Sequence, residues 1–258
     1  MGTAMTRKVL ITNLKVMFTN WFRSKQQQKI SITTDIHSHL LPGIDDGVKT
    51  IEESIEVIEY LSSLGFKKLI TTPHIMSDYY KNTPEIIREK LEQVKQAISE
   101  ANIPIEIEAA AEYYLDEYFY SLIIEGKELL TFGDNYVLFE TSFTVEPLIL
   151  KEIIFKLNSA GYKPVYAHPE RYFYLQEKKE LLNELIDQGL LFQLNALSLV
   201  GYYSKQVQKM AEALINRGAI AFIGSDTHNM LQANFLQEAY SSKYAHKLKT
   251  ETLLNHSL

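Results

Sequence analysis

Short apolar, β-prone runs alternate with longer helical patterns along most of the chain. Most runs are followed by a stretch whose apolar residues recur at the three- and four-residue spacing of an amphipathic helix. Parallel neighbouring strands need such crossover helices, so the pattern predicts a parallel sheet in an α/β fold. The runs lie near residues 33–37, 68–72, 105–110, 136–140, 163–167, 190–194 and 219–224.

Two of the predicted helices begin at recognisable capping signals. Thr50 is followed three residues later by Glu53, which is the pattern of a capping box. Thr83 precedes Pro84, and proline is tolerated at the first helical position. The pattern over 115–130 is the least regular. Later helices are predicted at about 147–160, 177–188, 203–217 and 236–253.

Seven strand–helix units without a domain break favour a closed barrel. An open, doubly wound sheet is the alternative arrangement of the same elements. No glycine-rich phosphate loop follows any of the runs, which argues against a dinucleotide-binding or P-loop protein. The longest apolar stretches are far shorter than the roughly 20 residues that a transmembrane helix needs.

The composition of the 258 residues excludes some chemistry. The chain has no cysteine, so a cysteine nucleophile, a thiolate metal site and a disulfide are all impossible. The absence of disulfides fits a reducing compartment, and we expect a cytoplasmic protein. The net charge of −6 makes the chain a poor nucleic-acid binder.

The N-terminal segment differs from the rest in charge. Residues 1–34 carry lysine and arginine but no Asp or Glu. We interpret 1–32 as a basic extension, of which 1–4 are a cloning remnant, and 33–258 as the functional domain. The extension is either a partly ordered segment or a basic amphipathic helix that makes peripheral contact with an anionic membrane or a partner.

Most of the histidines fall at the ends of predicted strands. All strand carboxyl ends of a parallel barrel open onto one face, so residues distant in sequence would meet in one cleft. Glu140 closes the apolar run Tyr-Val-Leu-Phe-Glu, where an unpaired buried charge would be costly. The strand-end histidines and acids are His37, His39, His74, His168, His228, Asp35, Glu112, Glu140 and Asp226.

This concentration of ligand-type side chains predicts a multinuclear metal site. The donors are nitrogen and oxygen without sulfur, which suits manganese, iron, zinc or cobalt. The set has too many imidazoles for a magnesium or calcium site. Clustered divalent cations would offset the charge repulsion between a nucleophile and a phosphomonoester, so a metal-dependent phosphoesterase is the predicted function.

These motifs resemble the polymerase and histidinol phosphatase (PHP) superfamily, and within it the bacterial CpsB/CapC/YwqE-like tyrosine phosphatases of capsule and exopolysaccharide operons. The resemblance covers residues from about 33 to the C-terminus. The paired Asp45-Asp46-Gly47 points to this branch. The matching stretches are Asp-Ile-His-Ser-His-Leu-Leu-Pro-Gly-Ile-Asp-Asp-Gly (35–47), Thr-Thr-Pro-His (71–74), Ala-Glu-Tyr-Tyr (111–114), Leu-Phe-Glu (138–140), Ala-His-Pro-Glu-Arg-Tyr (167–172) and Gly-Ser-Asp-Thr-His-Asn (224–229).

The resemblance implies a distorted (β/α)7 TIM-like barrel with three divalent metal ions, manganese first and iron or zinc as alternatives. It also implies that Arg171 faces the substrate phosphate, with Glu112 bridging two ions and His228 able to donate a proton. An ion pair with Glu170 is the structural alternative for Arg171. The implied ligands are His37, His39, Glu112 and Asp226 for the first ion, Glu112, Glu140 and His168 for the second, and Asp46, His74 and His228 for the third.

The implied activity is hydrolysis of phosphotyrosine on a protein, with the tail of a bacterial tyrosine kinase as the partner. A small-molecule phosphatase, such as one for histidinol phosphate, is one alternative, and a non-enzymatic metal-stabilised adaptor is another. One departure from the family pattern is the absence of a basic residue in the segment after Asn229, over 230–238. That departure implies either that phosphate binding depends more on Arg171 or that the substrate preference differs from the family's.

Weaker candidates flank the motifs. Asp35 is a candidate acceptor that orients a ligand imidazole. Ser38 and Ser225 lie inside motifs without a nucleophile-elbow pattern and are expected to play supporting roles. Four tyrosines either line a groove for a phosphotyrosine ring or pack at the barrel rim, namely Tyr79, Tyr80, Tyr113 and Tyr114.

Overall fold

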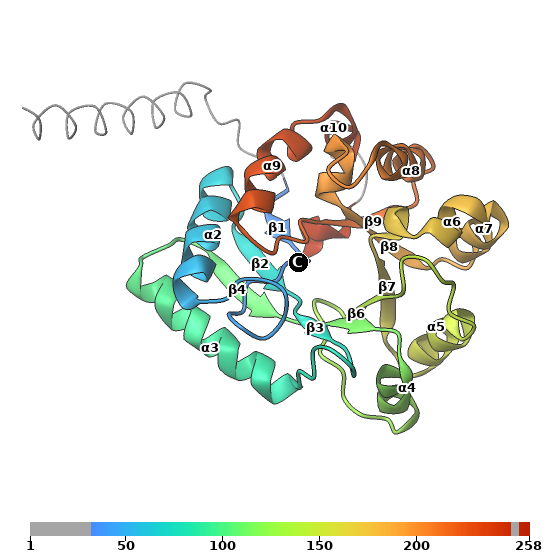
Figure 1. Cartoon of the computed structure of the whole chain (residues 1–258), viewed down its shortest axis with the longest axis horizontal. Coiled ribbons are helices and arrows are strands. Elements are labelled where there is room, and N and C mark those ends of the chain that lie inside the picture. Colours follow the sequence, from blue (N-terminus) through green and yellow to red (C-terminus); the bar gives the residue numbers. More distant parts are fainter. Residues whose placement is uncertain (1–31, 249–252) are drawn as a thin grey trace, which may run out of the picture.

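The structure is a computed structural model that describes residues 32–248 and 253–258. Parallel strands form a central barrel with helices around its outside (Figure 1). Strand order follows sequence order in both hydrogen-bonded sheets, β1-β2-β4 and β3-β5-β6-β7-β8-β9. The strands are β1 (Thr34–Asp35), β2 (Lys68–Thr71), β3 (His74–Ile75), β4 (Glu106–Ala109), β5 (Glu112–Tyr114), β6 (Tyr136–Glu140), β7 (Lys163–Ala167), β8 (Leu191–Asn195) and β9 (Ile220–Gly224).

Each of the seven predicted runs contains a strand, and two further short strands were not predicted. After an interruption at Thr72-Pro73 the chain beyond the second run continues as β3, and after an interruption at Ala110-Ala111 the chain beyond the third run continues as β5. Proline has no N–H to donate to a ladder, yet the Pro73 carbonyl still accepts from Glu112 N at 3.1 Å. The interruptions therefore divide the hydrogen-bonded strands into two sheets, and both sheets still contribute to the same barrel.

The first and last runs close the barrel, so the open-sheet alternative is wrong. Asp226 N donates to His37 O at 2.7 Å, and His39 N donates to Thr227 O at 2.9 Å. These bonds join the two runs at their carboxyl ends, and an isolated parallel bridge between Ser38 and Thr227 marks the same contact.

Side chains complete the closure below this point. Asn255, which is buried, accepts from Ile223 N and donates to Thr34 O, so it bridges β9 to β1. Asp35 accepts from both Ser225 N and Ser225 Oγ across the same seam. These hydrogen bonds from Ser225 agree with a structural role for Asp35 at the start of the first strand, the alternative to orienting a ligand imidazole.

The helices match the predicted periodicity except near the C-terminus. The single helix expected over 236–253 is wrong. Asn229 caps a helix that starts earlier, at Met230, and a second helix begins after Ser242, whose hydroxyl accepts from Ala245 N. The helices are α2 (Ile51–Leu64), α3 (Pro84–Glu100), α4 (Glu117–Ile124), α5 (Leu150–Ser159), α6 (Phe173–Glu177), α7 (Lys179–Asp187), α8 (Lys205–Asn216), α9 (Met230–Tyr240) and α10 (Lys243–Leu248).

The capping predictions are confirmed at both sites. Thr50 accepts from Glu53 N at the start of α2, and Thr83 accepts from Ile86 N at the start of α3. The irregular segment 115–130 contains the short helix α4, which is capped by Asp116.

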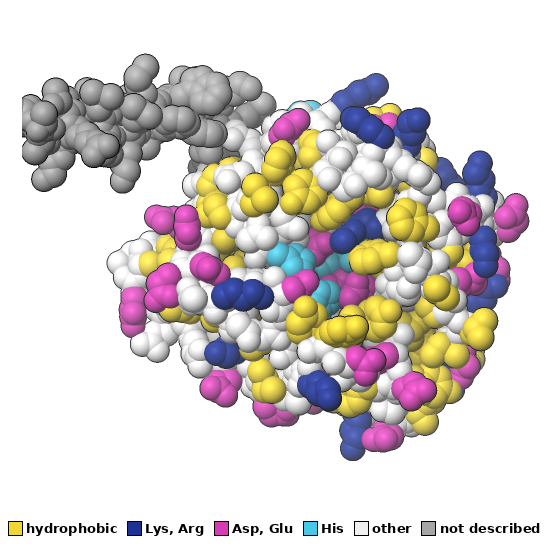
Figure 2. Space-filling model, in the orientation of Figure 1, with side chains coloured by type: hydrophobic (Ala, Val, Ile, Leu, Met, Phe, Trp, Pro, Cys, Tyr) yellow, Lys and Arg dark blue, Asp and Glu magenta, His cyan; other side chains and the backbone are white. Residues whose placement is uncertain are grey.

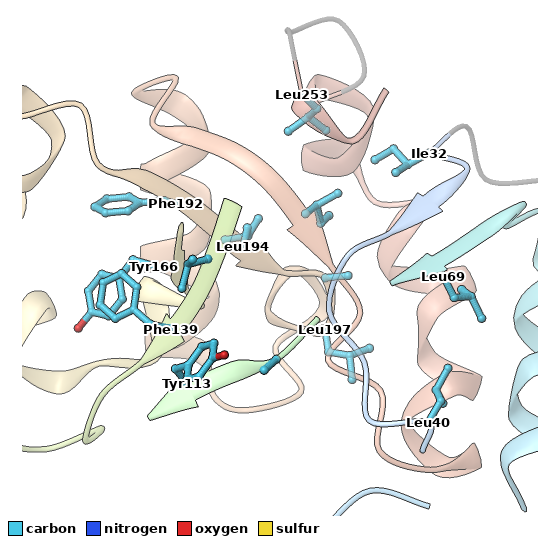
Figure 3. Close-up of a cluster of buried hydrophobic side chains, with 14 of the residues drawn as sticks. Ile32, Leu40, Leu69, Tyr113, Phe139, Tyr166, Phe192, Leu194, Leu197 and Leu253 are labelled. Atoms are coloured by element: carbon cyan, nitrogen blue, oxygen red, sulfur yellow. The ribbon is translucent and has the colours of Figure 1, made fainter. Parts of the chain in front are cut away.

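Alternation along the strands divides the core into two parts. In β6, Tyr136 and Leu138 belong to the cluster inside the barrel, and Glu140 continues this face into the site. Val137 and Phe139 face the helices and join the larger outer cluster, part of which appears in Figure 3. The inner apolar layer thus forms the floor beneath the polar strand ends.

The N-terminal extension predicted over 1–32 lies, apart from Ile32, outside the described residues. Ile32 itself is fully buried in the outer cluster. Within the described part of the chain, no helix is long and apolar enough to cross a membrane.

Candidate metal centre

The nine predicted metal ligands converge at the carboxyl-terminal end of the barrel. In the space-filling view, histidine and acidic side chains meet in a hollow at the centre of this face (Figure 2). A cavity of about 430 Å³ opens there, and it is lined by seven of the nine and by Arg171. The remaining two, His37 and His39, are completely buried beneath it.

His37 and His39 face two carboxylates. Their Nε2 atoms lie 3.4 Å apart. Each is within 3.5 Å of Glu112 Oε2 and 3.4 Å of Asp226 Oδ1. Four donor atoms from three strand ends therefore surround one point, which agrees with the first predicted ligand group.

Hydrogen bonds at the far side of each imidazole fix which nitrogen faces the centre. Gln193 Nε2 donates to Leu194 O, so Gln193 Oε1 is the atom that accepts from His37 Nδ1 at 2.9 Å. His39 Nδ1 donates to Asp45 Oδ2 at 2.8 Å. In the neutral rings the proton sits on Nδ1, and the Nε2 lone pair points at the centre.

Glu112 lies between two groups of donor atoms. Its Oε2 lies 3.1 Å from His37 Nε2, whereas its Oε1 lies 3.1 Å from His168 Nε2. Glu140 is on the same side as His168, with 3.8 Å between Glu140 Oε2 and His168 Nε2. The two oxygens of Glu112 thus point to two neighbouring groups of donors.

The third group is nearer the mouth. Asp46 Oδ1 lies 3.4 Å from the Nε2 atoms of both His74 and His228. His228 Nδ1 donates to Asp226 O at 2.9 Å, so its Nε2 lone pair also faces inward. His74 touches two groups, because its Nδ1 lies 3.2 Å from both Glu112 and Glu140.

The donor chemistry fits bound cations. When the rings of His37, His39 and His228 are neutral, their protons are on Nδ1, so their Nε2 lone pairs face carboxylate oxygens with no hydrogen between them. His74 Nδ1 is buried without a hydrogen bond. Within the described residues, four sets of donor atoms lie close enough to share an ion: His39/Asp46/His74/His228, His37/His39/Glu112, His37/His168/Asp226 and His74/Glu112/Glu140. Nitrogen and oxygen donors of this kind suit first-row divalent metals.

The charges in the cluster perturb one another strongly. Burial alone would lower the pKa of His37, but the carboxylates of Glu112 and Asp226 outweigh it and raise that pKa. Burial would raise the pKa of Glu112, yet the charges of His37 and His74 hold it well below its usual range. The carboxylates therefore stay ionised and available to a cation.

The backbone is strained at two of the ligands. His168 and Asp226 have φ values of 34° and 50°, in the left-handed region that non-glycine residues seldom occupy. Such conformations cost on the order of 1–3 kcal/mol and persist where surrounding contacts hold them. Gly224 adds a close approach, because a Cβ there would lie 2.6 Å from the Cβ of His37.

Arg171 stands at the rim of the cavity. Its Nη1 donates to Asp226 Oδ2 at 2.8 Å, so Arg171 pairs with Asp226 and not with the predicted alternative Glu170. Its guanidinium lies between the rings of Phe143 and Tyr203, at 4.6 and 4.2 Å from their centroids. The stacking holds the planar group in one orientation.

The predicted aromatic groove residues divide into two kinds. Tyr80 and Tyr114 line the cavity. Tyr113 is buried in the core, where it stacks on Phe119, and Tyr79 is exposed and does not line the cavity.

Several supporting residues were not identified from the sequence. Asp45 was recognised only as part of a motif, although its carboxylate orients His39. Gln193 lies within the apolar strand β8 and Asn195 ends it, and both are buried. Polar residues are seldom buried in such a strand, so their positions in the sequence could have indicated a role in the site. Asn195 Nδ2 donates to Asp226 Oδ2 at 2.8 Å, leaving Oδ1 free to face the histidines.

Comparison with known proteins identifies the family to which this chain belongs. Residues 33–253 match the family described as capsular polysaccharide synthesis, CpsB/CapC. The chain is 33% identical over 210 residues to the tyrosine-protein phosphatase YwqE of Bacillus subtilis, covering 80% of this chain and 81% of YwqE. It is 29% identical over 235 residues to the tyrosine-protein phosphatase CpsB of Streptococcus pneumoniae, covering 86% and 95%.

The structural comparison agrees. A crystal structure described among those of YwqE from Bacillus subtilis and CpsB from Streptococcus pneumoniae, unique metal-dependent tyrosine phosphatases, superposes with a TM-score of 0.76 at 30% identity. It covers 84% of this chain and 87% of that one. An amidohydrolase from Mycoplasma synoviae, at 12% identity and a TM-score of 0.51, shares the fold alone.

Proposed function

The chain belongs to the CpsB/CapC family, and from this premise we propose that it is a metal-dependent protein-tyrosine phosphatase. The observation that carries the proposal is the convergence of nine imidazole and carboxylate ligands beneath a cavity with Arg171 at its rim. The relatives that share this domain are named tyrosine phosphatases. The domain that performs the reaction is assigned to residues 33–258, with 1–32 as an extension.

Three divalent cations are proposed, as the family resemblance implies, and the four overlapping donor sets in the site support binding of more than one ion. The first would be held by His37, His39, Glu112 and Asp226; the second by Glu112, Glu140 and His168; the third by Asp46, His74 and His228. When bound, such cations neutralise phosphate charge and acidify a coordinated water. Manganese is the proposed metal, with iron or zinc as alternatives.

The role proposed for Arg171 is to bind the phosphate. Asp226 and the two flanking rings hold its guanidinium at the cavity, and a planar fork matches two phosphate oxygens at once. The leaving group is a phenol with a pKa of about 10, so it needs little protonation. His228 lies partly exposed at the mouth, but as a ligand of the third ion its Nε2 would carry no proton, and its Nδ1–H already bonds Asp226 O. We therefore propose His228 as a ligand and not as the proton donor to that oxygen.

The shape of the cavity supports an aromatic ester as the substrate. Tyr80, Tyr114 and Phe143 contribute aromatic walls on the side facing solvent, and Met76 adds a flexible apolar surface. A phenyl ring attached to the phosphate would contact these rings, since aromatic pairs add about 0.5–1.5 kcal/mol beyond their area. The opening to solvent leaves room for the rest of a polypeptide.

The proposed physiological substrate is the phosphorylated tail of a bacterial tyrosine kinase involved in capsule or exopolysaccharide synthesis. The description of the family as one of capsular polysaccharide synthesis supports this context. A peripheral membrane contact through the basic extension is part of the proposal, and it falls outside the described residues.

The test is hydrolysis of phosphotyrosine peptides by protein whose metal content is measured in the same preparation. We expect activity that is lost with a chelator and unaffected by thiol alkylation, because the chain has no cysteine. His37→Ala and Glu112→Ala should each abolish turnover, and His256→Ala, which changes an exposed histidine in the tail, should not. Histidinol phosphate turned over far faster than every phosphopeptide would overturn the assignment.

A further inference from the structure

A second cavity adjoins the catalytic one beyond the end of β3. Its volume of about 370 Å³ is within the range of small-ligand sites. The residues that line it include Ile75, Met76, Tyr80, Lys81, Asn82 and Tyr118. None of these belongs to the proposed metal ligands.

A single fixed wall separates the two cavities. Met76 and Tyr80 line both. Their backbones exchange two hydrogen bonds, of 2.9 and 3.1 Å, and the Tyr80 ring stacks on His74 with 5.5 Å between centroids. Asn82 Nδ2 fixes the chain beyond the wall by donating to both Ile44 O and His74 O. The second cavity therefore has a defined position relative to the metal ligands.

The chemistry of the second cavity suits an apolar side chain. Ile75, Met76 and the rings of Tyr80 and Tyr118 supply apolar surface, and Tyr118 on α4 is 39% exposed. Lys81 is exposed and, among the described residues, has no carboxylate within ion-pair distance. Covering exposed apolar surface is favourable, and the unpaired cation favours an acidic group beside the apolar one.

We propose that this cavity is a peptide subsite, which binds an apolar side chain, aromatic by preference, within two residues of the phosphotyrosine. The inference rests on the proposed function, because it takes a phosphotyrosine in the catalytic cavity as its starting point. An extended peptide advances at most about 3.3–3.6 Å per residue. A neighbour one or two positions away from the phosphotyrosine therefore lies within reach of the cavity on the other side of Met76 and Tyr80, which line both cavities.

The experiment compares phosphotyrosine peptides that differ only at the flanking positions, with Gly, Leu or Phe one or two residues from the phosphotyrosine. The readout is the ratio of kcat/KM for the Phe peptide to that for the Gly peptide. For the wild type we expect a ratio of about ten at the preferred position, since part of a phenyl side chain becomes buried. Tyr118→Ala should lower this ratio to about two, and Tyr118→Phe, which keeps the ring, should retain it.

The matched control is Phe155→Ala, which truncates an exposed aromatic side chain on α5 that lines neither cavity. It should keep the wild-type ratio. Hydrolysis of p-nitrophenyl phosphate, which is too short to reach Tyr118, reports the state of the catalytic site in each preparation.

The outcomes separate the subsite from the function. Wild type that cleaves every peptide at the same kcat/KM would refute the subsite while leaving the phosphatase assignment intact. A flanking preference that persists in Tyr118→Ala would also refute it, because the preference would then arise elsewhere. Protein that cleaves neither the peptides nor p-nitrophenyl phosphate, with metal present, would remove the proposed function itself.

Discussion

Replacing Asp45 by asparagine tests whether a buried hydrogen-bond partner sets the metal affinity of the site. Asp45 Oδ2 accepts from His39 Nδ1 at 2.8 Å and from His74 N at 3.2 Å, and Oδ1 accepts from Gly47 N at 2.9 Å. Burial opposes ionisation of Asp45, but the charge of His39 and the hydrogen bond to it outweigh this and lower the pKa of Asp45. An asparagine has one acceptor where the carboxylate has two.

The substitution therefore forces a choice between the bond to Gly47 and the bonds to His39 and His74. If the amide oxygen keeps Gly47, the amide NH₂ faces His39 Nδ1, and the imidazole must move its proton to Nε2, which then cannot bind a cation. If the amide oxygen keeps His39 and His74, the imidazole loses the carboxylate charge that raises its basicity as a ligand. Loss of an outer partner of this kind weakens metal binding by about 10- to 100-fold, which is about 1.4–2.7 kcal/mol.

The assay is titration of metal-free protein with Mn²⁺ and, separately, Zn²⁺, with bound metal and phosphotyrosine hydrolysis followed together. The free metal concentration at half-saturation should rise by that factor in Asp45→Asn. Asp134→Asn is the control, because Asp134 is an exposed carboxylate that pairs with Lys163. Superimposable binding curves for Asp45→Asn and wild type would show that the Asp45 hydrogen bond has no part in metal affinity.

Three further predictions concern the support of the site. Gly224→Ala should lower the free energy of unfolding by about 1–3 kcal/mol and reduce metal content, because the new Cβ would lie 2.6 Å from that of His37; a urea midpoint equal to wild type would contradict the clash. Asn255→Ala removes the bridge between the first and last strands and should cost roughly 2–4 kcal/mol in urea unfolding, whereas a loss below 1 kcal/mol would show that the seam holds without it. Tyr203→Leu removes one face of the stack on Arg171 and should raise KM for a phosphotyrosine peptide roughly three- to tenfold; an unchanged KM would argue against that positioning role.

The buried charges explain why the centre depends on so many supporting residues. For His37, His39 and His228, Nε2 is directed at the carboxylates of the centre and Nδ1 is hydrogen-bonded to an acceptor behind the ring, whereas both nitrogens of His74 face carboxylates. Asp226 divides its oxygens in the same way, with Oδ2 held by Asn195 and Arg171. Arg171 therefore links the proposed phosphate site to Asp226, a proposed metal ligand. A substitution at Arg171 should alter metal binding, and a substitution at Asp226 should alter phosphate binding.

Local patterns in the sequence were sufficient for the elements and for the type of site. The apolar period of the runs and helices reports which face of each element is buried, and that depends on neighbours three or four positions away. Eight of the nine candidate ligands lie at predicted strand ends, where the general geometry of parallel barrels places an active site, whereas Asp46 was implied only by the family resemblance; the structure brings all nine together. The helix after Asn229 was misplaced because its start depends on one capping side chain.

Tertiary structure alone decided how the barrel closes and how each ligand is oriented. Closure joins His37 to Asp226 and Asn255 to Thr34, and these pairs are separated by about 190 and by 221 positions in the sequence. The same closure brings Ser225 within hydrogen-bond distance of Asp35 and places Gln193 where it accepts from His37 Nδ1. Sequence patterns carry no record of such contacts, because hydrogen-bond partners are selected by the positions of atoms in the closed barrel and not by spacing along the chain.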